Sequence, residues 1–103
     1  MKIIAVGDED TVIGLKLAGI DEGYIPLSSD DAVKYITEKV YNDSDVGLII
    51  LTERLARKIR EKIKEFFERE RPIFVEIPDK YGAVEEDVLR DLVRKAIGVE
   101  IKL

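Results

Sequence analysis

Val46-Gly-Leu-Ile-Ile-Leu51 is the most hydrophobic stretch of the chain. A short, uninterrupted apolar run is typical of a strand that is buried on both faces, as the central strands of parallel sheets are. We therefore expect this segment to form the middle of a parallel sheet, with helices covering it from both sides.

Other apolar runs flank this segment in the chain and predict further strands. They are Lys2–Val6, Tyr24–Leu27 and Ile73–Ile77. Pro26 cannot donate a backbone hydrogen bond, so the strand that contains it belongs at a sheet edge. Because strands alternate with helical patterns, we predict an α/β fold with parallel strands. The expected architecture is a shortened doubly wound sheet, receiver- or flavodoxin-like, of four strands in the order 2-1-3-4, followed by a C-terminal helix.

The segments between these strands have the apolar spacing of helices. They are residues 11–18, a stretch that ends near Asn42, and a longer one that Pro72 stops. Residues that cap helices with their side chains precede each of them: Asp8 or Asp10, then Ser28 or Ser29, then Thr52. On the third helix we expect a single apolar stripe to face the sheet, made of Leu55, Ile59, Ile63, Phe66 and Phe67.

The composition excludes several classes of function. The 103 residues include no cysteine and no histidine, which removes thiolate chemistry and the commonest general base near neutral pH. The net charge of -5 argues against a nucleic-acid partner. No apolar run approaches the roughly 20 residues of a membrane-spanning helix, so we expect a cytosolic protein. The 38% of charged residues is typical of thermophiles.

The acidic run Asp8-Glu9-Asp10 follows the first predicted strand. Carboxylates at the carboxyl end of a parallel strand could hold Mg²⁺, with Asp8 and Asp10 as ligands, as in receiver domains. Receiver domains also need an aspartate at the end of the third strand, where this chain has Leu51-Thr52-Glu53. Helix capping is the interpretation that we favour. A Mg²⁺-binding signalling domain and a small-ligand domain with an apolar pocket at the strand ends stay open as alternatives.

No arrangement of residues in the chain predicts catalysis. Neither a dinucleotide-binding glycine motif nor a phosphate-binding loop is present, and Ser28 and Ser29 have no histidine to activate them. The basic residues between Arg54 and Lys64, Lys58 among them, alternate with glutamates, which favours a solvated helix face, with docking of an acidic partner as the alternative. We therefore expect a protein that docks into an assembly and does not catalyse a reaction.

The residues after Ile77 differ from the alternating pattern. Pro78–Gly82 is a loop with two helix breakers, and residues 85–97 form a helical pattern. The apolar residues of that pattern spread over about 220° of the helix, more than the roughly 100° that one contact needs. This helix has enough apolar surface to contact a second protein as well as its own domain.

Four motifs, in order along the chain, suggest a family. The first and most specific is Gly7-Asp-Glu-Asp-Thr-Val-Ile-Gly-Leu-Lys-Leu-Ala-Gly19. The others are Leu48-Ile-Ile-Leu-Thr-Glu53, Val75-Glu-Ile-Pro-Asp-Lys80 and Arg94-Lys-Ala-Ile-Gly98. Together they resemble the F subunit of the archaeal (A-type) and vacuolar-type rotary ATPases and ATP synthases.

The resemblance implies a non-catalytic component of the central rotor stalk of a proton- or sodium-translocating enzyme. Such a protein binds the long coiled-coil D subunit and turns inside the ring of catalytic A and B subunits, whose activity a mobile C-terminal helix modulates. Since the nucleotide sites lie on the A and B subunits, the resemblance implies no cofactor here. It implies a peripheral position on the cytoplasmic face of the membrane, without insertion into it.

The resemblance also assigns roles to particular residues of this sequence. The pattern over residues 85–97 becomes a helix that contacts the assembly through Val88, Leu89, Leu92 and Val93. The edge strand becomes a contact for the D subunit through Tyr24, Ile25 and Leu27. Pro78 and Gly82 become a hinge, so that the expected division is an α/β domain over 1–77, a hinge loop over 78–84 and a helix with a tail over 85–103.

Overall fold

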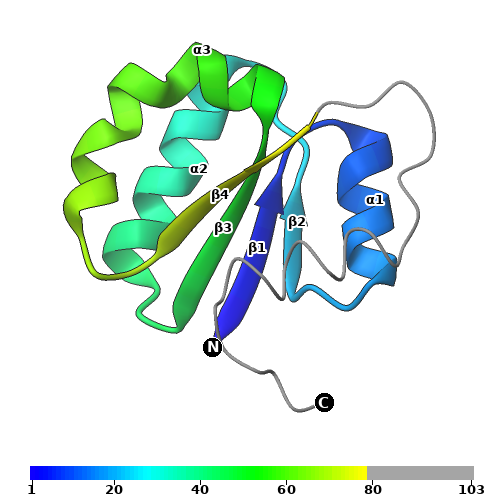
Figure 1. Ribbon diagram of the computed structural model, residues 1–103, viewed down its shortest axis with the longest axis horizontal. Coiled ribbons are helices and arrows are strands. Elements are labelled where there is room, and N and C mark those ends of the chain that lie inside the picture. The colour runs from blue at the N-terminus through cyan, green and yellow to red at the C-terminus, as the bar shows by residue number, and fades with distance from the viewer. Residues whose placement is uncertain (79–103) are drawn as a thin grey trace.

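β3 (Val46–Thr52) lies inside the sheet, and all seven of its residues are buried in the computed structural model, which describes residues 1–78. Around it the chain forms a parallel sheet in the order β2-β1-β3-β4, which confirms the predicted α/β class and strand order (Figure 1). In chain order the elements are β1 (Lys2–Val6), α1 (Glu9–Leu17), β2 (Glu22–Tyr24), α2 (Ser29–Asn42), β3, α3 (Glu53–Ile63), the 3₁₀ helix η1 (Lys64–Glu68) and β4 (Ile73–Ile77).

The strand register brings the carboxyl ends of the strands to one edge of the sheet. In β1 and β3, Ile4 pairs with Ile49 and Val6 with Leu51, and Ile50 pairs with Val75 of β4. We call this edge the carboxyl rim and the opposite one the amino rim. Every loop that leads from a strand into a helix therefore starts at the carboxyl rim, where parallel sheets place their functional residues.

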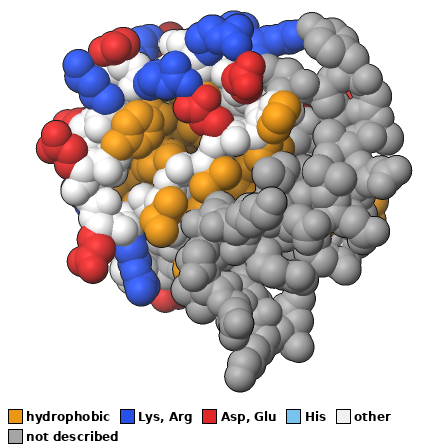
Figure 2. All heavy atoms as spheres, viewed as in Figure 1, with side chains coloured by type: hydrophobic (Ala, Val, Ile, Leu, Met, Phe, Trp, Pro, Cys, Tyr) orange, Lys and Arg blue, Asp and Glu red, His pale blue; other side chains and the backbone are white. Residues whose placement is uncertain are grey.

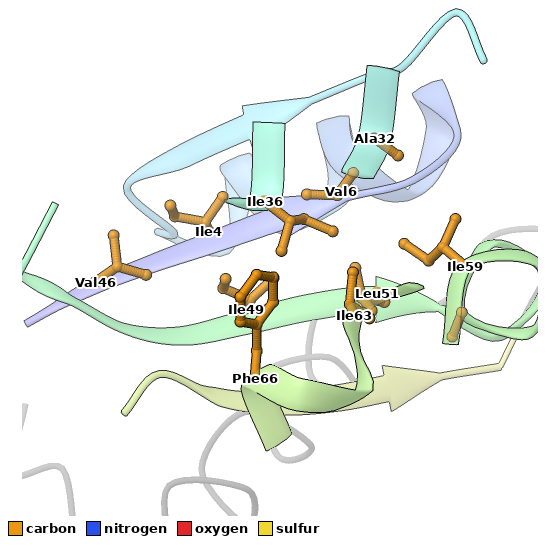
Figure 3. Packing of buried hydrophobic residues seen from close by; sticks show 11 residues of the cluster. Ile4, Val6, Ala32, Ile36, Val46, Ile49, Leu51, Ile59, Ile63 and Phe66 are labelled. Atoms are coloured by element: carbon orange, nitrogen blue, oxygen red, sulfur yellow. The ribbon is translucent and has the colours of Figure 1, made fainter. Parts of the chain in front are cut away.

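Helices cover both faces of the sheet, α2 and α3 on one side and α1 on the other (Figure 1). The larger cluster of buried residues fills the space under α2 and α3 (Figure 3). Burying one aliphatic side chain of this kind stabilises the fold by roughly 1.5–3 kcal/mol before ordering costs are counted. The buried cluster under α2 and α3 consists of Ile4, Val6, Ala32, Ile36, Val46, Ile49, Leu51, Ala56, Ile59, Ile63 and Phe66.

The second face of the sheet has its own buried cluster, to which α1 contributes Leu15. Leu48 and Ile50 of β3 point to this side, while Ile49 and Leu51 point to the other. The uninterrupted apolar run of β3 thus follows from burial on both faces, as the sequence predicted.

The second strand is shorter than predicted and lies earlier in the chain. We expected it over Tyr24–Leu27, but β2 ends at Tyr24. Its partner β1 runs only to Val6, opposite Tyr24, and the N–H of Gly7 donates to the Tyr24 carbonyl at 3.2 Å to close the pairing. With no further strand beside it, Ile25-Pro-Leu27 leaves the sheet as a loop.

The third helix also departs from the prediction. The α-helix ends at Ile63, and the chain continues as the 3₁₀ helix η1. Three residues per turn rotate successive side chains by about 120°, so the apolar stripe does not continue unchanged. Phe66 is buried as predicted, whereas Phe67 is 44% exposed and packs edge-on against Phe74.

The predicted caps of the first two helices are confirmed. A carboxylate oxygen of Asp8 accepts from the N–H of Thr11 at the start of α1, and the Ser28 hydroxyl accepts from the N–H of Asp31 at the start of α2. Such caps stabilise a helix by about 0.5–2 kcal/mol.

Within residues 1–78 no helix has the length and apolar character needed to cross a membrane.

Charged side chains join the strands at the amino rim. Lys2 of β1 contacts Asp43 at 2.8 Å and Glu22 at 3.3 Å, between nitrogen and oxygen atoms. Lys39 of α2 donates to the same Glu22 at 2.7 Å. Tyr35 lies beside them, with its hydroxyl 3.4 Å from Glu22. This network ties β1, β2 and the end of α2 together on the side away from the carboxyl rim.

The network shifts the titration of its members. The hydrogen bond from Lys39 lowers the pKa of Glu22, and the one from Lys2 lowers the pKa of Asp43. The hydrogen bonds to Asp43 and then Glu22 raise the pKa of Lys2. Burial raises the pKa of the Tyr35 hydroxyl. A carboxyl whose pKa is lower in the folded state stabilises the fold above its unfolded pKa, and this stabilisation is lost as pH falls through the folded value.

We predict that replacing Lys2 by methionine weakens the acid dependence of stability. Without the Lys2 ammonium, the pKa values of Asp43 and Glu22 in the folded state move back toward their ordinary values. Urea unfolding between about pH 7 and about pH 3 should then show a smaller loss of unfolding free energy in the variant than in the parent chain.

The control for this prediction is Lys34→Met. Lys34 is exposed and makes no ion pair with any of residues 1–78, so this variant should follow the parent chain across the pH range. Parallel pH profiles for Lys2→Met and the parent would contradict the prediction.

Candidate functional site

Loops from three strands converge at the carboxyl rim around a surface hollow of about 410 Å³. Gly7 and Asp8 follow β1, the loop Ile25–Ser28 and the first residue of α2 follow β2, and Thr52 ends β3. The hollow lies where the connections from β1 and β3 diverge to opposite faces of the sheet. In doubly wound sheets this is the switch point at which ligands and partners usually bind.

One wall of the hollow is apolar and unusually exposed. Leu27 is 95% exposed and Ile25 is 46% exposed, although both are large aliphatic residues. Tyr24, just before them, is half-buried and stacks on Tyr35, with ring centroids 4.3 Å apart and planes 6° from parallel. The structure thus brings the three predicted contact residues together, two as free apolar surface and Tyr24 as the support that holds the loop against α2.

The other predicted contact residues cannot be placed. Val88, Leu89, Leu92 and Val93, together with Gly82 of the expected hinge, lie outside the described residues. Pro78 is the last residue that the structure describes. The division of the chain after residue 77 therefore stays a prediction.

The acidic run after β1 is engaged in building α1. Both carboxylate oxygens of Asp8 accept hydrogen bonds from Thr11, one from its backbone N–H at 3.2 Å and the other from its hydroxyl at 2.7 Å. Glu9 and Asp10 are exposed. Within residues 1–78 no three acidic side chains gather in a way that could hold a metal ion. The structure thus supports the capping role of Asp8 and offers nothing further for the Mg²⁺ alternative.

Thr52 does not cap α3, contrary to the prediction. Its backbone occupies the capping position, but its side chain makes no hydrogen bond to the first turn. Its Cγ2 methyl instead fills the space beside Gly7, where a Cβ atom would lie only 2.5 Å away. Close packing of β3 against the loop after β1 therefore sets the side-chain orientation of Thr52.

Sequence reasoning named Leu55 in the apolar stripe and Lys58 in the basic stretch, but it placed neither of them at this site. Both lie on α3 and line the hollow beside the loop after β2. Lys58 is exposed, and it makes no ion pair within residues 1–78. The signal that could have found them is the rule that functional residues gather beyond the carboxyl ends of parallel strands, applied to the first turns of the helix after β3.

The hollow differs from the pocket that a small-ligand domain predicts. It opens to solvent, and charged and hydroxyl-bearing side chains line much of it. Enclosed sites for small molecules bury most of the ligand against apolar side chains. An open hollow with polar side chains, next to an exposed apolar loop, resembles a protein contact surface more than a small-molecule cavity.

The basic side chains of α3 and η1 are largely paired with acids on the surface, in agreement with the predicted solvated face. Arg57 contacts Glu53 at 2.9 Å, and Lys64 contacts Glu61 at 3.1 Å. Exposed pairs of this kind contribute about 0.3–0.5 kcal/mol each. They favour a solvated face for this side of the helix.

A second, smaller hollow lies against the edge strand β4. Figure 2 shows apolar side chains gathered on this face, with charged side chains around them. Phe67 and Phe74 form part of its wall, and Ile73 is 46% exposed. At its border Arg60 donates to both carboxylate oxygens of Glu76. Arg60 therefore has an anionic partner, and Arg69, the other cation that lines this hollow, lies over the ring of Tyr41, in contrast to the lysine at the carboxyl rim.

Comparison with known proteins identifies relatives over the full chain. The family model described as "ATP synthase (F/14-kDa) subunit" matches residues 3–97. The F subunit of the A-type ATP synthase of Pyrococcus furiosus is 45% identical, and the alignment covers 99% of each chain. The proteins of the same name from Methanococcus aeolicus and Methanocaldococcus jannaschii are 46% and 43% identical, over 99% of this chain and 100% of theirs.

We predict that Gly7→Ala destabilises the fold by about 1–3 kcal/mol, because the new methyl group would overlap the Thr52 Cγ2 atom. Thr52→Ser removes that atom and keeps the hydroxyl. The double variant Gly7→Ala/Thr52→Ser should therefore recover part of the loss, which a double-mutant cycle of unfolding free energies measures. Strict additivity of the two changes would show that Gly7 and Thr52 do not contact each other as described.

Proposed function

This chain belongs to the ATP synthase (F/14-kDa) subunit family, and from that membership we propose that it is a non-catalytic component of the central rotor stalk of an A-type ATP synthase. The observation that carries the proposal is the exposed apolar loop at the carboxyl rim, where Ile25 and Leu27 lie free on the surface of a small acidic domain. Large exposed aliphatic residues in a group mark contact surfaces.

The partner that we propose for this loop is the long coiled-coil D subunit of the stalk. A coiled coil presents a continuous helical surface, which a short protruding loop can contact without rearranging its own domain. The stacking of Tyr24 on Tyr35 supports this role, because it fixes one end of the loop to α2 and so lowers the ordering cost of binding.

The absence of catalysis is part of the proposal. The chain has no histidine and no cysteine, and Asp8, the acidic residue at the switch point, is engaged with Thr11. We propose that the nucleotide sites belong to the A and B subunits and that this protein acts on them mechanically. It would then lie on the cytoplasmic face of the membrane, held there through the complex, whatever the coupling ion.

We further propose that residues 78–84 act as a hinge and that the helix expected over 85–97 modulates the A and B subunits. The support is in the sequence, since Pro78 and Gly82 interrupt the chain after the last strand and the apolar face of the helical pattern is wider than one contact needs. The proposed contact residues are Val88, Leu89, Leu92 and Val93.

The loop is tested by the double variant Ile25→Asp/Leu27→Asp. We expect it to bind the cognate D subunit at least about tenfold more weakly than the parent chain by isothermal titration calorimetry, because two buried carboxylates would lack partners. Ile13→Asp is the control, since Ile13 is 47% exposed on α1, away from the hollow, and should leave binding unchanged. Failure of the parent chain to associate with the folded D subunit would rule out the proposed function.

The tail is tested by amide hydrogen exchange on the isolated full-length chain. We expect residues 85–97 to exchange faster than β3, because a helix that leaves its domain opens without global unfolding. Addition of a complex of the D subunit with the A and B subunits should slow that exchange. Equal protection of the two segments in the isolated chain would contradict a mobile helix.

A further inference from the structure

The hollow at the carboxyl rim contains a polar group that nothing within the described domain uses. Thr52 is only 4% exposed, and its hydroxyl makes no hydrogen bond with any group of residues 1–78. Among those same residues no polar side-chain atom is both sealed from solvent and without a partner. The Thr52 hydroxyl therefore reaches solvent, and Thr52 is among the residues that line the hollow.

The start of α3 places further hydrogen-bond donors at the same point. α1 and α2 satisfy first-turn N–H groups with the side chains of Asp8 and Ser28, but α3 has no such cap. The uncapped N–H groups of a helix start carry partial positive charge and favour an acceptor with negative charge. The hydroxyl of Thr52 and the start of α3 thus favour the same kind of group.

The charges around the hollow also favour a negatively charged group. Lys58 lines it and makes no ion pair within residues 1–78, and the side chain of Arg54 also borders it. Of the nearby acids, Asp8 has both oxygens on Thr11, and Glu53 contacts Arg57 at 2.9 Å. An incoming anion would therefore meet a lysine that no acid of the described domain neutralises.

Aliphatic side chains also line the hollow, beside Ser28 and Ser29. They are Ile25, Leu27 and Leu55. Free inorganic anions gain nothing from such a wall, and Asp8 would repel a multiply charged group such as phosphate. A single carboxylate carried among apolar side chains satisfies both parts of the surface.

We propose that this hollow receives one aspartate or glutamate side chain from an otherwise apolar helical segment of the partner. The carboxylate accepts from the Thr52 hydroxyl and the start of α3 and pairs with Lys58, while neighbouring apolar residues of the partner pack on Ile25, Leu27 and Leu55. This inference rests on the proposed function, in which that partner is the D subunit, and adds the chemistry by which the partner is recognised.

Thr52→Val and Lys58→Glu test the proposal in the full-length chain. The first keeps the shape of residue 52 and removes only the hydroxyl, and we expect it to weaken binding of the cognate D subunit by roughly threefold to tenfold. The second reverses the charge and should weaken binding by at least about tenfold, with a smaller dependence of affinity on salt. Lys34→Glu, a charge reversal on α2 outside the hollow, is the matched control and should bind as the parent does.

Charge exchange identifies the carboxylate itself. Aspartates and glutamates of the D subunit are replaced one at a time by lysine, and one replacement should restore binding to Lys58→Glu while weakening binding to the parent chain. Thermal unfolding of each variant separates loss of binding from loss of folding.

The outcomes distinguish the two levels of the proposal. If Thr52→Val and Lys58→Glu fold and bind the D subunit as tightly as the parent, the carboxylate inference is overturned and the rotor-stalk role stands. If Lys34→Glu weakens binding as much as Lys58→Glu, the inference is also overturned, because the effect is then general electrostatic attraction. A parent chain that does not bind the D subunit at all would overturn the proposed function, and the inference with it.

Discussion

Burial of β3 on both faces is the constraint on which the rest of the structure depends. A strand without a polar face needs a neighbour along each edge and a helix layer above and below it. β1 and β4 supply the edges, and α2, α3 and α1 supply the layers. Because parallel neighbours must be joined by crossovers, every loop from a strand into a helix starts at the same rim. The site at the carboxyl rim is therefore a consequence of how β3 is buried.

The two rims of the sheet carry different chemistry for this reason. At the amino rim, where chains enter the strands, Lys2, Glu22, Lys39 and Asp43 satisfy one another. At the carboxyl rim the capping groups of α1 and α2 are satisfied, whereas the Thr52 hydroxyl and Lys58 find nothing within the described part of the domain. Polar groups that only water satisfies, beside exposed aliphatic residues, leave an isolated protein with a surface that a partner in an assembly can cover.

Most of the architecture could be predicted from the sequence, because it depends on patterns that act locally. The predicted strand order is correct, although Pro26, which was used to place the second strand at a sheet edge, lies in the loop after β2. The errors concern features that depend on neighbours: β2 ends where β1 ends, Phe67 turns outward where the helix tightens, and Thr52 packs on Gly7 and leaves α3 uncapped. Tyr24, Ile25 and Leu27 were predicted as contact residues of an edge strand from the family resemblance; the structure places Ile25 and Leu27 on a loop, and their contact role stays a prediction. Lys58 was not predicted at the site, since only the meeting of three loops distinguishes it from the other lysines of α3.

The separation of the two rims also bears on how such a domain can evolve. Residues at the amino rim and in the core are coupled to one another, so substitutions there change the stability of the whole domain. Ile25 and Leu27 protrude from a loop whose backbone leaves the sheet after Tyr24, and the core hardly depends on which side chains they carry. Substitutions at these two positions can therefore change partner specificity, together with matching changes in the partner, while each successive sequence still folds. A lineage could exchange the surface that a partner recognises while inheriting the same sheet unchanged.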